Sequence, residues 1–182
     1  MSQVSIWAYC LMPNHVHLIA VPNSADGLRQ AFSVAHRRYT LRINRREGWK
    51  GCLWQGRFAS FPMDDQHLLA ATRYVLLNPV RAGLAAQPGD WPYSSARAHL
   101  GQAKDELVDI DALADRIADW NQLLAVAPNW GERSRFRRHE SSGVPLGDER
   151  FLEEVQELTG RDLEGELRRR RGAQGRSSSS KT

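Results

Sequence analysis

The chain has 182 residues, a formal net charge of +4, 41% hydrophobic and 25% charged residues. These proportions are ordinary for a globular protein and argue against a fully disordered or fibrous chain, and the length suits one domain with an appendage or two small domains. No apolar run approaches the ~20 residues of a membrane span. The N-terminus, MSQVSIWAYC, also lacks the basic start and long apolar region of a secretory signal.

The first predicted element is a β-hairpin. Residues 5–11 and 15–21 are apolar, aromatic and β-branched, and the intervening MPN is a turn signal. If 15–21 is a strand, His15 and His17 point to one face about 7 Å apart, while Val16 points to the other face and into a core. Two imidazoles on one face can bind a divalent ion, although the triplet HVH also arises by chance alternation.

A long amphipathic helix is predicted next, over residues 28–47, with Gly48 as its C-terminal stop. Residues 52–62 then predict another strand. A second helix is expected from a cap at Asp64 or Asp65 to residue 78, where Pro79 ends it. A short helix is plausible at 94–100.

The character of the chain changes beyond about residue 105. Residues 109–126 predict helix, and residues 128–147 predict a basic loop rich in helix breakers. Residues 148–160 predict a final amphipathic helix with a glycine stop. The last residues are rich in arginine, glycine and serine, and this composition predicts a disordered tail.

Positive charge is concentrated in three stretches. Residues 37–57 carry seven Lys or Arg against the single acid Glu47, residues 133–138 read RSRFRR, and residues 168–171 are four arginines. Aromatic residues lie among these cations, and cations that meet phosphates beside rings that stack on bases favour a nucleic-acid partner. The alternative is a solvated basic helix face with core aromatics.

The second helix carries a possible partner for the histidines. Tyr74 and Asn78 are four residues apart and share a helical face. Asn78 can offer an amide oxygen as a third metal ligand, and Tyr74 a phenolic oxygen beside the ion. A phenol has a pKa of about 10, and a nearby cation favours its ionised, nucleophilic form. In the alternative interpretation Tyr74 is a core residue and Asn78 only ends the helix.

At this point the chain resembles a known family. The segments AYCLMPNHVHLI, LWQGRF, RYVLLNPVRAGL and DWPYSS look like those of the REP-associated tyrosine transposases, which are HUH single-strand endonucleases of the insertion-sequence-200-like superfamily. GVPLGDERFLEEVQELTGR is similar to the C-terminal region of many members. The resemblance covers residues 5–165 in chain order.

The resemblance implies an α+β fold, with a small antiparallel sheet and helices on one face, as in RRM or ferredoxin-like HUH domains. It implies a catalytic domain at 1–104, a helical, basic DNA-binding extension at 105–167 and a basic tail at 168–182. Family members usually carry a further strand and helix before the hairpin. We therefore expect an exposed sheet edge and reduced stability here.

The resemblance also assigns roles to residues. His15, His17 and Asn78 would bind a divalent ion, Mg²⁺ or Mn²⁺, and Tyr74 would be the catalytic nucleophile. The implied reaction is metal-dependent cleavage and joining of single-stranded DNA at hairpin (REP-like) sequences through a 5′-phosphotyrosine. The residues expected to hold the DNA are Arg37, Arg38, Arg42, Arg45, Arg46, Trp54 and Arg57.

Two other functions fit the same residues. One is a non-catalytic DNA-binding remnant of a transposase, and the other is a metal-dependent phosphoesterase that uses water as its nucleophile. We expect a monomer or homodimer in the bacterial cytoplasm, associated with the nucleoid and not with a membrane.

Overall fold

The computed structural model describes residues 4–126, 130–163 and 165–166. They form an α+β fold with a small antiparallel sheet and a helical C-terminal portion, which confirms the predicted fold class. Two compact units are present, residues 1–58 with 71–128 and residues 59–70 with 129–182. The predicted tail at 168–182 lies outside the described residues. Within the described ranges no helix is long and apolar enough to cross a membrane.

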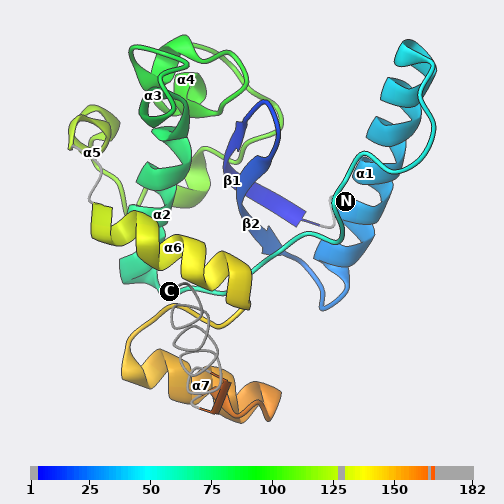
Figure 1. Cartoon of the computed structure of the whole chain (residues 1–182). Helices are drawn as coiled ribbons and strands as arrows, with labels where there is room; N and C mark the ends of the chain where they lie inside the picture. The colour runs from blue at the N-terminus through cyan, green and yellow to red at the C-terminus, as the bar shows by residue number, and fades with distance from the viewer. Residues whose placement is uncertain (1–3, 127–129, 164, 167–182) are drawn as a thin grey trace, which may run out of the picture. The chain divides into compact units, whose positions relative to one another are not determined.

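The predicted hairpin is confirmed as β1 (Val4–Leu11) and β2 (Val16–Pro22), drawn in blue in Figure 1. The strands pair antiparallel with Cys10 opposite His17 and Leu11 opposite Val16. The amide of Met12 closes the loop on the carbonyl of His15 at 2.9 Å. The prediction that Val16 enters a core is wrong, because Val16 lies at the turn end of the hairpin and is 38% exposed.

Residues 93–95 pair with the edge of β1 that does not face β2. The amide of Leu11 donates to the carbonyl of Tyr93 at 2.8 Å, the amide of Ser95 donates to the carbonyl of Tyr9 at 3.1 Å, and Cys10 and Ser94 form an isolated bridge. In the described part of the chain β2 pairs in a ladder only with β1.

The strand predicted at 52–62 is wrong, because this segment is coil, and its part up to Phe58 packs against α1 (Gly27–Glu47). The ring of Trp54 stacks on His36 at 4.0 Å between centroids, and Phe58 lies 4.8 Å from Phe32. These ring contacts hold the segment along the helix, so its backbone is not available to the sheet.

The predicted bounds of α1 are confirmed. Gly48 ends the helix in the left-handed conformation, φ 68°, with its amide on the carbonyl of Asn44. A left-handed residue is the usual helix stop, and glycine adopts it without steric cost. The expected apolar stripe is only partly covered, because Ile43 is buried whereas Tyr39 is 51% exposed.

The second helix does not end at Pro79. It runs as α2 (Asp65–Leu76) and, after Leu77, as α3 (Asn78–Arg81). Leu77 donates its amide to Arg73 and Arg81 donates to Leu77, so helical hydrogen bonds pass through the junction. Proline is tolerated because it sits in the first turn of α3, where its missing N–H has no helical partner to lose.

The rest of the first unit consists of short elements. They are η1 (Pro88–Asp90), α4 (Ala96–His99), η2 (Asp111–Leu113) and α5 (Trp120–Ala125). The short helix predicted at 94–100 is confirmed as α4. The continuous helix predicted at 109–126 is wrong, because Asp119 is extended and its carboxylate caps a new helix by accepting from the amides of Asn121 and Gln122.

The second unit contains α6 (Trp130–Ser142) and α7 (Glu149–Thr159). The loop predicted at 128–147 is therefore wrong over most of its length. The helix breakers Gly143 and Pro145 lie just beyond α6, and Phe136 inside it is buried. The final helix is confirmed, with Asp148 as its N-cap and left-handed Gly160 as its stop.

Asp64 joins the starts of α2 and α7. One carboxylate oxygen accepts from the amide of His67 at 2.8 Å and from its ring Nδ1 at 2.6 Å, and the other accepts from the amide of Asp148 at 2.8 Å. Burial would raise the pKa of Asp64, but the hydrogen bonds from His67 and Asp148 outweigh it and lower that pKa. The carboxylate therefore stabilises the fold at neutral pH, and this contribution is lost as the pH falls through its lowered folded-state pKa.

We predict that Asp64→Asn lowers the free energy of unfolding by about 1–2 kcal/mol. The hydrogen bonds from His67 and from the amide of Asp148 would both lose a charged acceptor. Urea unfolding at pH 7 measures this. The difference from the wild type should shrink below about pH 4. Glu153→Gln, at an exposed position in the middle of α7, is the control and should change the free energy by less than about 0.5 kcal/mol. Equal losses in both variants would contradict the role given to Asp64.

Candidate functional site

The two histidines meet at the end of the hairpin. Their Nε2 atoms are 3.0 Å apart, and the rings are edge to face with centroids 4.7 Å apart. His15 is exposed and His17 is half-buried. His15 Nδ1 lies 2.7 Å from Oδ1 of Asn14. An Asn14 oxygen there selects the tautomer of His15 that carries its proton on Nδ1, which leaves Nε2 as an acceptor facing His17.

This spacing fits a divalent ion. Two imidazole nitrogens at about 2.1 Å from one ion, at right angles, would be about 3.0 Å apart. Within the described residues no group of three or more His, Cys, Asp or Glu gathers at a common point. A third protein ligand would therefore be of another type, such as an amide oxygen. Asn14 would hold the ring of His15 from outside, as hydrogen-bonded partners of metal-binding histidines usually do.

Tyr74 lies against His17. The two ring centroids are 5.5 Å apart with the planes at 80°, and the guanidinium carbon of Arg81 lies 4.7 Å from the centroid of the same tyrosine ring. Tyr74 is buried, with 9% of its surface exposed. The hairpin and α2 thus place a phenol next to the histidine pair, and a cation from α3 holds its ring.

Asn78 follows Tyr74 by one helical turn, at the start of α3. Its Nδ2 is buried and has no hydrogen-bond partner among the described residues. An unpaired buried donor costs about 1–3 kcal/mol. The oxygen and nitrogen of an asparagine amide are told apart by their hydrogen-bond partners. If the amide of Asn78 is flipped, its oxygen takes the buried position that Nδ2 occupies here. An amide oxygen and two imidazole nitrogens are donors of the types that a divalent ion accepts.

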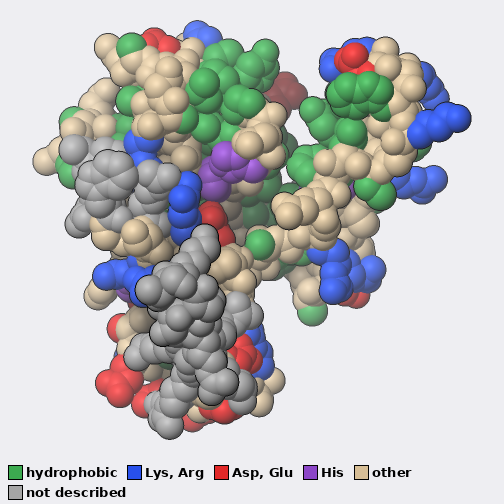
Figure 2. Space-filling view, viewed as in Figure 1, with side chains coloured by type: hydrophobic (Ala, Val, Ile, Leu, Met, Phe, Trp, Pro, Cys, Tyr) green, Lys and Arg blue, Asp and Glu red, His purple; other side chains and the backbone are tan. Residues whose placement is uncertain are grey.

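The residues expected to hold DNA come from α1 and the coil that follows it. Figure 2 shows Lys and Arg side chains along α1. Trp54 differs from the arginines, because it is half-buried, stacks on His36 and donates its indole N–H to the carbonyl of His36 at 3.3 Å. One face of this indole is therefore engaged within the protein. The exposed arginines are Arg37, Arg38, Arg42, Arg45, Arg46 and Arg57, with Arg46 paired to Glu47.

Sequence reasoning missed two residues of the site. Arg81 was missed because the helix was expected to stop at Pro79. Its position seven residues after Tyr74, two helical turns on, is the signal that a continuing helix would have given. Asn14 was treated only as a turn residue, although it precedes His15 directly.

Residues 1–77 match the family model described as "Transposase IS200 like". A protein of Haemophilus influenzae named as a REP-associated tyrosine transposase is 29% identical over 99 residues, which cover 48% of this chain and 56% of the relative. The chain thus spans about half the length of this curated relative. No solved structure matches. The matched segment includes His15, His17 and Tyr74 and ends one residue before Asn78.

The ring contacts of Tyr74 predict how its variants fold. Tyr74→Phe keeps the ring between His17 and Arg81, so the free energy of unfolding should change by less than about 1 kcal/mol. Tyr74→Ala removes a buried ring and should cost about 3–5 kcal/mol. Urea unfolding of the two variants against the wild type measures this. Equal losses would show that the hydroxyl, and not the ring, carries the packing role.

Proposed function

We propose, from the match of residues 1–77 to the model of IS200-like transposases, that the protein cleaves and joins single-stranded DNA through Tyr74. The observation that carries the proposal is the contact of the Tyr74 ring with His17, which in turn meets His15. A hydroxyl nucleophile beside a candidate metal site is the arrangement that phosphoryl transfer needs.

In the cleavage step, the phenolic oxygen of Tyr74 attacks a phosphorus of the DNA backbone. The new bond joins Tyr74 to the 5′ side of the break, and the bond from phosphorus to the 3′ oxygen breaks. The proton of the phenol leaves to solvent or a base, and the departing 3′ oxygen takes one up to become a hydroxyl. The 5′-phosphotyrosine keeps the energy of the phosphodiester, so a second 3′-hydroxyl can reverse the step and join strands without ATP.

His15, His17 and Asn78 would hold the divalent ion, Mg²⁺ or Mn²⁺. When bound, such an ion acts as a Lewis acid on the phosphate oxygens. Two imidazole ligands favour Mn²⁺ intrinsically, whereas Mg²⁺ is the more abundant ion. Arg81, with its guanidinium over the Tyr74 ring, keeps the ring in place and adds positive charge on the phenol's side of the site.

The exposed arginines of α1 would hold the phosphates of a single strand, with the hairpin of a REP-like sequence beside the cleavage point. We assign residues 1–104 to the catalytic domain. Residues 105–167 would be the DNA-binding extension, since the exposed Arg135, Arg137 and Arg138 lie on α6.

One observation favours a second candidate function. Tyr74 is 9% exposed, so the nucleophile is largely covered in this structure. A transposase remnant that grips DNA without cutting it would keep the arginines and leave Tyr74 as a core residue. Formation of a covalent adduct separates the two functions.

We predict that the protein forms a covalent adduct with hairpin-containing single-stranded DNA in the presence of Mn²⁺. The adduct should appear as a shifted band on a denaturing gel and be absent in Tyr74→Phe. Tyr39→Phe is the matched control, because Tyr39 is an exposed tyrosine of α1 and its loss should leave the band. A band that persists in Tyr74→Phe would remove Tyr74 from the role, and a wild type without any band would favour the remnant.

We also predict that His15→Ala and His17→Ala abolish the adduct while DNA affinity changes by less than about twofold, since the arginines supply the grip. Arg42→Gln should leave the adduct in place and reduce the affinity for DNA instead. It should lower the slope of log affinity against log salt by about 0.7, the value for one phosphate contact on a single strand. Fluorescence anisotropy at several salt concentrations measures both. Histidine variants that cut like the wild type would make these histidines ordinary residues of the hairpin.

A further inference from the structure

Three exposed apolar or aromatic side chains form a row at the turn end of the hairpin. Tyr93 is 59% exposed, Leu11 40% and Val16 38%. We propose that this stacking row, with Trp91 beside it, is a platform on which bases next to the cleaved phosphate stack. The proposal rests on the proposed function for its partner, single-stranded DNA, but does not require that the DNA be cut.

Strand pairing puts the three side chains on one face. Leu11 is the partner of Val16 in the hairpin ladder. On its other edge, Leu11 donates its amide to the carbonyl of Tyr93 at 2.8 Å, and the neighbouring pair Cys10–Ser94 forms an antiparallel bridge. Residues opposite each other across paired strands share a face of the sheet. Tyr93, Leu11 and Val16 therefore lie side by side across three short stretches of chain.

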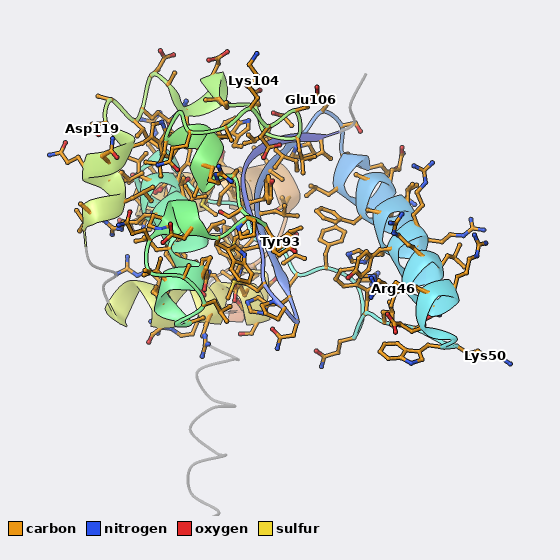
Figure 3. The ribbon with its side chains drawn as sticks, turned by 90° about the horizontal axis from the view of Figure 1, so that it is seen from above. Arg46, Lys50, Tyr93, Lys104, Glu106 and Asp119 are labelled. Atoms are coloured by element: carbon orange, nitrogen blue, oxygen red, sulfur yellow. The ribbon has the colours of Figure 1, made fainter. Side chains whose placement is uncertain are left out.

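The aromatic end of the row is held in place. The indole N–H of Trp91 donates to the carbonyl of Leu11 at 3.0 Å, and the rings of Trp91 and Tyr93 lie 5.6 Å apart at 75°. Rings fixed before binding lose little conformational entropy when a base stacks on them. Figure 3 shows the labelled Tyr93 alongside the hairpin strands.

The row ends next to the candidate site in the sequence, but on the opposite face of the hairpin. Val16 stands between His15 and His17 in the sequence, and its side chain points to the face opposite that of its neighbour His17. A strand whose phosphate meets the histidines would pass around the end of the hairpin, and its flanking bases would meet Val16, Leu11 and then Tyr93. Stacking on aromatic rings is open to every base, so the row would position the strand without reading its sequence.

A second copy of this chain is the other possible occupant. A stable protein interface needs about 20–30 residues on each side. The row has three exposed side chains and one half-buried indole, which is too few for such an interface but enough for two or three bases.

The test is anisotropy of a fluorescein-labelled oligothymidine with the full chain in EDTA, so that no cleavage intervenes. Tyr93→Ala should weaken binding by at least about fivefold and leave the salt slope unchanged, because stacking releases no counterions. Tyr93→Phe should bind within about twofold of the wild type. Leu84→Ala, at an exposed apolar residue outside the row, is the control and should have no effect.

The proposal would be overturned if Tyr93→Ala had the melting temperature and the oligothymidine affinity of the wild type. It would also be overturned if the wild type did not bind oligothymidine. A change of sedimentation coefficient in Tyr93→Ala without DNA would show that the row joins two copies instead. A wild type that binds through Tyr93 but forms no covalent adduct would contradict only the proposed cleavage and leave the stacking row in place.

Discussion

The register of the β-hairpin is the constraint on which the candidate site depends. Cys10 is buried opposite His17, so the face that carries Cys10 brings His17 against the ring of Tyr74. A slip of one residue would move every side chain of β2 to the other face of the sheet. His17 would then leave Tyr74, and Val16 would take its place. Residues 93–95 pair with the second edge of β1 at Tyr9 and Leu11, so both edges of β1 are hydrogen-bonded near the end that carries the histidines.

The second constraint is the passage of the helix through Pro79. Tyr74 lies in the last turn of α2 and Arg81 ends α3, and the hydrogen bonds across Leu77 keep the two short helices in helical register. Proline there lacks an N–H, but the first turn of a helix needs none. Arg81 can therefore lie over the ring of Tyr74 two turns back, at 4.7 Å. A helix that ended at Pro79 would place no cation on the tyrosine, so the local tolerance for proline decides the electrostatics of the site.

The sequence was most informative where local chemistry decides the structure. The hairpin, the stop of α1 at Gly48 and both ends of α7 follow from turn residues and caps, which act within a few positions. It failed where distant contacts compete with local preference. Residues 52–62 have strand-like composition, but Trp54 and Phe58 find partners on α1 instead of a sheet. Of the candidate site, the pattern HVH and the spacing of Tyr74 and Asn78 were readable. Arg81 was not, because its position depends on a helix that continues past proline.

In the proposed function, two surfaces of different chemistry would meet single-stranded DNA, namely the arginines of α1 and the stacking row at the hairpin. The arginines of α1 attract phosphates at any sequence, and their contribution falls as salt rises. The hairpin end offers rings and aliphatic groups, whose contribution is insensitive to salt and acts only at contact distance. Charge alone would let a strand slide along α1 without a fixed position. In the proposed function, a short apolar row next to His15 and His17 would stop that sliding at one place, and the phosphate between stacked bases would be the one presented to Tyr74. The hairpin would then combine two tasks in adjacent residues, since Val16 would contact bases on one face while its neighbour His17 would face the reacting phosphate on the other.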